Sequence, residues 1–149
     1  MRPELKIAIQ GNLSSYSREV QEKMQGLVRR STYRASADAK RNAPSKFGHL
    51  RRSITEKISR LTGEIAVNVD YAGAVEFGSR PHVIRPKRKK ALAFKPGAGF
   101  RFWDESGRVV VKSVKHPGTR AQPFLTPAIE REAGKFQQGA KNIIENQGR

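Results

Sequence analysis

The sequence predicts an α+β fold in which a long N-terminal helix and a C-terminal helix pack on one face of a largely antiparallel sheet. Two observations lead to this fold class. Apolar residues recur at helical spacing near each end of the chain, and short segments that alternate apolar and polar residues lie between them. The chain has 149 residues, which suits one domain of ordinary size. We therefore predict a single domain over residues 1–149.

The N-terminal third predicts a short strand followed by the longest helix of the chain. Apolar and polar residues alternate over residues 5–9, as expected for a strand. Either Ser14 or Ser15 offers an N-cap for the helix, which should end near Asn42 because Pro44 disfavours helical geometry in the residue before it. The predicted buried face has apolar or small residues at helical spacing: Val20, Met24, Leu27, Val28, Ser31, Ala35 and Ala39.

The middle of the chain predicts a hairpin and then one helical turn. Alternation at residues 54–58 and 65–69, with a break at residues 61–63, indicates two strands joined by a turn. Residues 71–78 predict a single helical turn that ends at Gly78. Further strands are expected at residues 83–84, 92–94, 100–103 and 108–114, with a loop at 95–99 and a turn at 104–107.

The C-terminal segment predicts the second amphipathic helix. We expect Thr126 to cap this helix, with Pro127 at its first helical position. Its predicted apolar face contains Ile129, Ala133, Phe136, Ala140, Ile143 and Ile144. Residues 146–149 are expected to fray.

The chain is strongly basic, with 30 Lys and Arg against 13 Asp and Glu and a formal net charge of +17. Such self-repulsion predicts a polyanion or an acidic protein as a partner. Residues 79–103 contain no acidic residue, and we predict a basic arm or loop at residues 81–103 that contacts DNA or an acidic partner. A solvated loop whose charge serves solubility is the alternative interpretation. The candidate contact residues are Arg80, Arg85, Lys87, Arg88, Lys89, Lys90 and Lys95.

Composition also excludes several classes of protein and of site. The chain has no cysteine, which removes disulfides and thiolate chemistry and suits a reducing cytoplasm. No run of about 18 apolar residues occurs, so we expect no membrane-spanning helix. The three histidines, His49, His82 and His116, lie far apart in the sequence, and we expect no metal site. We also expect no cofactor, because the sequence has no glycine-rich phosphate loop.

Glu76 is the best candidate for acid–base chemistry in the chain. Its neighbours Val75 and Phe77 indicate a partly buried setting that would raise its pKa. No second carboxylate accompanies it, so the favoured interpretation is a structural role, either pairing with an arginine or capping a backbone turn. We therefore predict that the protein is not an enzyme. A nuclease that uses Glu76 and Asp70 is the alternative.

An ordered run of motifs spans residues 43–129. The first stretch is Ala43-Pro44 with Gly48-His49-Leu50-Arg51-Arg52-Ser53-Ile54, followed by Tyr71-Ala72 and Val75-Glu76-Phe77-Gly78-Ser79. The second is His116-Pro117-Gly118-Thr119-Arg120-Ala121-Gln122-Pro123-Phe124-Leu125, and Pro86-Lys87 and Ala91-Leu92-Ala93-Phe94 lie between the two. Together they resemble the head-to-tail joining proteins of long-tailed phages, also called tail completion or neck proteins. The chain departs from the family at Lys46-Phe47, where members commonly have an acidic residue and a threonine.

The resemblance implies a structural virion protein, made in the host cytoplasm, at the head-to-tail joint. It would form a ring, a hexamer or a dodecamer, against neighbouring connector, tail terminator or tail-tube proteins, with phage DNA in the lumen. The expected subunit or neighbour contacts are His116, Pro117, Gly118, Arg120, Pro123 and Phe124. The alternative function is a non-sequence-specific nucleic-acid-binding protein, for which binding should weaken steeply with salt.

Overall fold

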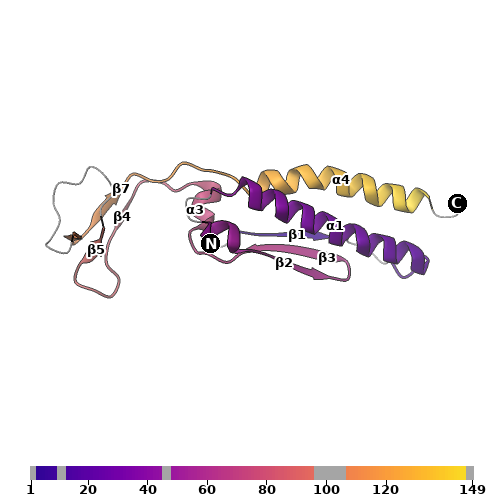
Figure 1. The fold of residues 1–149 in the computed structure, drawn as a ribbon, viewed down its shortest axis with the longest axis horizontal. Helices are drawn as coiled ribbons and strands as arrows, with labels where there is room; N and C mark the ends of the chain where they lie inside the picture. Colours follow the sequence, from indigo (N-terminus) through magenta and orange to yellow (C-terminus); the bar gives the residue numbers. More distant parts are fainter. Residues whose placement is uncertain (1–2, 10–12, 45–47, 96–106, 147–149) are drawn as a thin grey trace. The chain divides into compact units, whose positions relative to one another are not determined.

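The computed structural model shows a chain that divides into two units (Figure 1). Residues 1–78 and 121–149 form the main unit, and residues 79–120 form the basic unit. The structure describes residues 3–9, 13–44, 48–95 and 107–146. The predicted arm at 81–103 lies within the basic unit, although its residues 96–103 lie outside the described residues.

The sheet of the main unit has three described strands, β1 (Glu4–Ala8), β2 (Ile54–Ser59) and β3 (Thr62–Val67). Their order is β1-β3-β2, and both pairings are antiparallel. The predicted hairpin is confirmed, but its turn comes earlier than expected. Ser59 pairs with Thr62, so the turn is Arg60-Leu61 and Gly63 lies within β3.

The long helix α1 (Arg18–Asn42) ends where the sequence predicts but begins later. Ser17 is the N-cap, and its side chain accepts a hydrogen bond from the Val20 amide at 3.3 Å. The predicted caps Ser14 and Ser15 are wrong because they lie in a turn closed by a hydrogen bond from the Tyr16 amide to the Leu13 carbonyl. All seven residues of the predicted inner face are buried.

The helix α1 passes unusually close to strand β3, which explains the position of Gly63. A Cβ atom at Gly63 would lie 1.7 Å from Thr32 Oγ1 and 2.9 Å from Thr32 Cβ. Thr32 is fully buried, and its hydroxyl donates a hydrogen bond to the Val28 carbonyl at 2.8 Å. Glycine is therefore required here by close packing and not by a turn.

The second long helix, α4 (Thr126–Glu145), lies alongside α1 on the same side of the sheet (Figure 1). This arrangement confirms the predicted α+β class. The main core contains buried residues of α1, of the short helices α2 (His49–Arg52) and α3 (Ala72–Phe77), of the sheet and of the start of α4. A second cluster contains Val20, Met24 and Leu27, against which Phe136, Ala140 and Ile143 pack.

Two predictions about α4 are wrong. Thr126 is the first helical residue, and the N-cap position belongs to Leu125, which makes no side-chain cap. Ala133 is exposed and Ile144 is 41% exposed, whereas Ala128 and Glu132 are buried. The inward-facing stripe of α4 therefore follows a four-residue spacing through buried Ala128 and Glu132 to half-buried Phe136, and it includes a carboxylate.

The described part of the basic unit contains two pairs of short antiparallel strands. Strand β4 (His82–Ile84) pairs with β7 (Val114–His116), and β5 (Leu92–Phe94) pairs with β6 (Val109–Val111). The single strand predicted at residues 108–114 is wrong, because the chain changes pairing partner between β6 and β7. The predicted strand at 100–103, and most of the loop and turn beside it, lie outside the described residues.

Candidate nucleic-acid interface

The basic unit has a high concentration of positive charge. Its described residues, 79–95 and 107–120, include eleven Lys and Arg and no Asp or Glu. Seven of them are the predicted contact residues, and all seven are exposed. The other four, which are also exposed, are Arg108, Lys112, Lys115 and Arg120.

The described part of the chain supplies little to neutralise these cations. Apart from Arg108, none of these eleven cations forms an ion pair with a residue that the structure describes. The ion pairs among the described residues lie in the main unit. Because these exposed cations repel one another, the approach of a polyanion lowers the free energy of the unit.

The two ends of the basic unit are held together by close backbone contacts. Ser79 and Thr119 exchange two backbone hydrogen bonds, of 2.9 and 3.0 Å. Gly118 lies between this bridge and β7 with φ of 91°, and a Cβ atom there would lie 2.3 Å from the Ser79 carbonyl oxygen. Only glycine fits both the conformation and the space, which gives the Pro117-Gly118 motif a structural reason.

A pair of histidines joins β4 to β7. The rings of His82 and His116 stack with centroids 5.0 Å apart. His82 Nδ1 lies 2.8 Å from the Arg80 carbonyl oxygen, so this nitrogen donates, whereas His116 Nδ1 accepts from the Gly118 amide at 3.1 Å. The sequence did not indicate this pair, because only the strand register brings the two residues together.

The predicted contact residues of the second motif differ in their exposure. Pro117, Arg120 and Pro123 are exposed, and His116 and Gly118 are half-buried. Phe124 is fully buried in the main core, where it anchors the start of α4. A side chain without exposed surface cannot contact a neighbouring subunit. Phe124 is therefore a core residue and not the subunit contact that we expected.

Glu76 caps helix α4 from a distant part of the chain. Its Oε2 accepts hydrogen bonds from the Phe124 amide at 2.9 Å and the Leu125 amide at 3.0 Å, and its Oε1 accepts one from the Thr126 amide at 2.8 Å. The carboxylate thereby satisfies amides at a helix N-terminus, where the helix dipole also favours negative charge. The predicted structural role, the capping of a backbone turn, agrees with this geometry.

The direction of the Glu76 pKa shift is opposite to the one expected. Burial of the side chain would raise its pKa, but the hydrogen bonds from Leu125, Thr126 and Phe124 outweigh burial and lower it. Both carboxylate oxygens accept hydrogen bonds from backbone amides, so protonation of Glu76 would weaken the helix cap. This geometry argues against the general acid–base role that the nuclease alternative assigns to Glu76.

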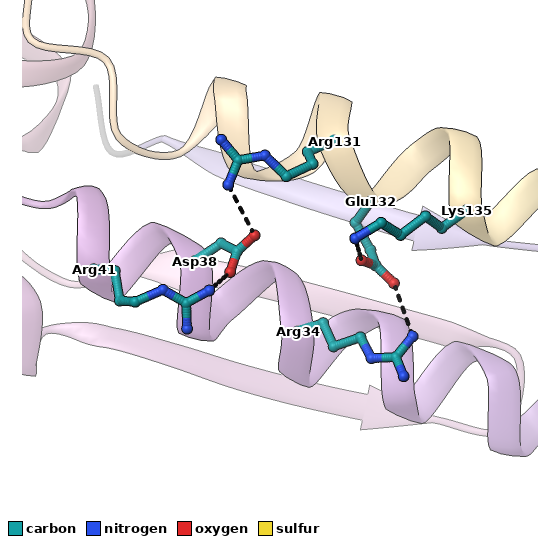
Figure 2. A network of polar contacts seen from close by, with 6 residues as sticks. All are labelled: Arg34, Asp38, Arg41, Arg131, Glu132 and Lys135. Atoms are coloured by element: carbon teal, nitrogen blue, oxygen red, sulfur yellow. Dashed lines mark hydrogen bonds and ion pairs between the residues drawn. The ribbon is translucent and has the colours of Figure 1, made fainter.

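A polar network links α1 to α4 (Figure 2). Asp38 of α1 pairs with Arg41 and, at 3.4 Å, with Arg131 of α4. Glu132 of α4 is buried between Arg34 of α1 at 4.0 Å and Lys135 at 3.9 Å, and its Oε1 has no hydrogen-bond partner among the described residues (Figure 2). The one sign of this network in the sequence is Glu132, a carboxylate that lies among the apolar residues of the inward-facing side of α4.

The described residues include neither a cluster suited to a metal ion nor a helix suited to a membrane. No group of three or more His, Cys, Asp or Glu side chains there could hold a metal ion. None of the described helices has both the length and the apolar character needed to cross a bilayer.

The sequence of the main unit is similar to that of a family of phage tail components. Residues 7–78, just under half of the chain, match the family described as "Bacteriophage HK97-gp10, putative tail-component". The matched segment runs from β1 through α1, α2, β2 and β3 to the end of α3. The match confirms the resemblance to the joining proteins of long-tailed phages, and it covers, up to Gly78, the first of the two stretches that carry this resemblance; the second, residues 116–125, lies outside it. No curated protein and no solved structure gave a significant match.

Proposed function

We propose that this chain is a non-enzymatic structural subunit at the head-to-tail joint of a long-tailed phage. It assembles as a ring that joins the connector to the tail tube around the DNA channel. Its neighbours are connector, tail terminator or tail-tube proteins. The observation that carries the proposal is the match of residues 7–78 to a tail-component family.

The thin core of the basic unit supports assembly with neighbours. Val109 is its only buried residue among those described, and two-stranded sheets are marginal in water unless something packs against them. Val83 and Val110 are 49% and 55% exposed on its strands. Neighbouring subunits would cover such surface and order the unit.

The main unit also carries exposed aromatic residues suited to contacts. Phe77, at the end of α3, is 69% exposed, and Tyr71, before the same helix, is 48% exposed. Exposed aromatic side chains are enriched at protein interfaces. Copies related by a rotation axis would bury these side chains repeatedly, and the same rotation would gather the basic units around one lumen.

The proposal assigns no catalytic role to the chain. What supports this is the commitment of both Glu76 oxygens to backbone amides. If the chain were a nuclease that uses Glu76 and Asp70, the Glu76→Gln and Asp70→Asn variants should not cleave DNA. DNA cleavage retained by both variants would exclude this alternative.

Particles assembled without this chain test the proposed function. We expect electron microscopy to show full heads and complete tails that are separate, with joining restored when the purified protein is added. Heads and tails joined normally in its absence, in infectious particles, would contradict the proposal.

The alternative function, a free nucleic-acid-binding protein, is favoured only by the basic unit, whose described residues include no Asp or Glu. It differs from the proposed function in where the protein is found. A free binding protein would be absent from purified particles, whereas a joint subunit would be present in a fixed number of copies.

A further inference from the structure

We propose that the basic unit binds the phosphate backbone of double-stranded DNA without reading the base sequence. This inference deepens the proposed function, and it rests on that function for the identity of the duplex as the phage's own DNA. The sequence left open whether the basic residues meet DNA, an acidic protein or only solvent. The distribution of charge over the two units distinguishes these partners.

The density of charge matches that of a nucleic acid. Between β4 and β5, five of the six residues 85–90 are Lys or Arg, and all five are exposed. Cations spaced so closely along the chain need an equally dense row of anions. Duplex DNA carries one negative charge per about 1.7 Å of its axis, a density that folded protein surfaces rarely approach.

A second copy of this chain cannot supply those anions. The main unit is itself basic, with 18 Lys and Arg against 11 Asp and Glu. Most of its carboxylates already form an ion pair with a Lys or Arg of the same copy. Glu76 instead accepts hydrogen bonds from backbone amides of the same copy. The paired carboxylates are Glu19, Glu22, Asp38, Glu56, Glu64, Glu132 and Glu145.

The residue types favour phosphate over an acidic protein surface. Six of the eleven described cations of the basic unit are lysines, which protein interfaces exclude from their buried centres. The described part of the unit also has no exposed Phe, Tyr or Trp beside these cations, the residues that anchor most tight contacts to another protein. Lysine on an exposed strand or loop suits a phosphate, which it meets as a point charge.

Recognition of the base sequence is not expected from these residues. The described part of the basic unit contains no Asn or Gln, the side chains that pair with adenine, and no Asp or Glu, which accept from cytosine. Its Arg and Lys could pair with guanine, but these described residues include no helix that would place them in the major groove. Contacts to phosphate position a protein on the duplex but carry no sequence information. A ring through which the whole phage genome passes would need to bind every base sequence equally well.

Binding of the intact chain to two short duplexes of unrelated sequence tests the inference. Fluorescence anisotropy over a series of salt concentrations should give equal affinities for the two duplexes and a linear fall of log K with log salt. The triple variant Lys87→Gln, Lys89→Gln, Lys90→Gln should flatten the slope by up to about 2.7, because each phosphate that a lysine no longer neutralises lowers the slope by about 0.9.

A matched variant controls for net charge. Lys23→Gln, Lys57→Gln, Lys141→Gln removes three exposed lysines of the main unit and should leave the slope unchanged. Circular dichroism should show both variants folded. The inference is overturned if the intact chain does not bind at low salt, or if the two triple variants weaken binding equally.

Poly-L-glutamate separates DNA from an acidic protein as the partner. At equal concentration of negative charge it should compete poorly with the duplex, and equal competition would overturn the inference in favour of an acidic partner. The outcome is independent of the particle experiment: separate heads and tails would uphold the proposed function even if the purified chain failed to bind DNA.

Discussion

Replacing Gly63 by alanine is expected to lower the free energy of unfolding by about 3 kcal/mol, the upper end of the range for inserting a methyl group into a packed core. The added Cβ would lie 1.7 Å from Thr32 Oγ1, far inside van der Waals contact. Thr32 and the neighbouring Ile65 are buried, so α1 and β3 can separate only by opening the main core. Urea unfolding followed by circular dichroism measures the loss.

Gly134→Ala is the matched control, because a Cβ at that position of α4 meets nothing within 4 Å. It should stabilise the helix by up to about 1 kcal/mol, the difference in helix propensity between the two residues. Adding Thr32→Ala to Gly63→Ala should recover part of the loss, since it removes the hydroxyl that clashes. A Gly63→Ala protein as stable as the parent would contradict the close approach of α1 to β3.

Replacing Glu76 by glutamine is expected to cost about 2 kcal/mol or more at pH 7, because buried amides then lose a charged acceptor. The glutamine keeps the volume of the side chain, but its NH₂ group faces amide donors of residues 124–126 and cannot accept from them. The N-terminus of α4 should fray. Amide hydrogen exchange at its first turn and denaturant unfolding measure the two effects.

The stabilisation by Glu76 should depend on pH with a defined sign. Its pKa in the folded protein is lowered, whereas a free glutamate titrates near pH 4.3. The carboxylate therefore contributes its full stabilisation above about pH 4.3, and the contribution disappears as pH falls through the lower folded pKa. The stability difference between the parent and Glu76→Gln should be largest near neutral pH and should shrink in acid.

An exposed carboxylate of the same helix provides the comparison. Glu130→Gln should change stability by no more than about 0.5 kcal/mol, as is usual for surface substitutions. If Glu76→Gln behaved like this control, or if its effect grew toward low pH, the capping interaction described here would be refuted.

Local sequence pattern was sufficient to predict the main elements of the fold. The seven-residue face of α1 follows from helical spacing alone, because an amphipathic helix of this length must bury one side. Pro44 correctly marks its end, and Gly78, with φ of 77°, ends α3 as expected. Each of these features depends on residues within one or two turns of the position concerned.

The features that the sequence did not reveal depend on distant residues. Gly63 resembles a turn glycine, but its reason is Thr32 on another element. Burial of Glu76 was inferred correctly from Val75 and Phe77, yet Phe77 is exposed and the amides that lower the pKa lie about fifty residues later. The stacking of His82 on His116 likewise requires the strand register.

The candidate interface was the most local feature of all. A stretch of Lys and Arg without acids is visible in the sequence, and exposure of all seven predicted contact residues agrees with it. What the structure adds is the absence of neutralising partners within the described residues, Arg108 aside, and the pairing of most main-unit carboxylates. Those two facts direct the positive charge toward another molecule.

Imaging of the assembled particle by cryo-electron microscopy is the most direct test of the account. It should show a closed ring of copies of this chain between the connector and the tail tube, with residues 85–90 of each copy directed at the DNA in the lumen. Copies found elsewhere in the particle, or a ring whose residues 85–90 face away from the DNA, would contradict the role assigned to the chain.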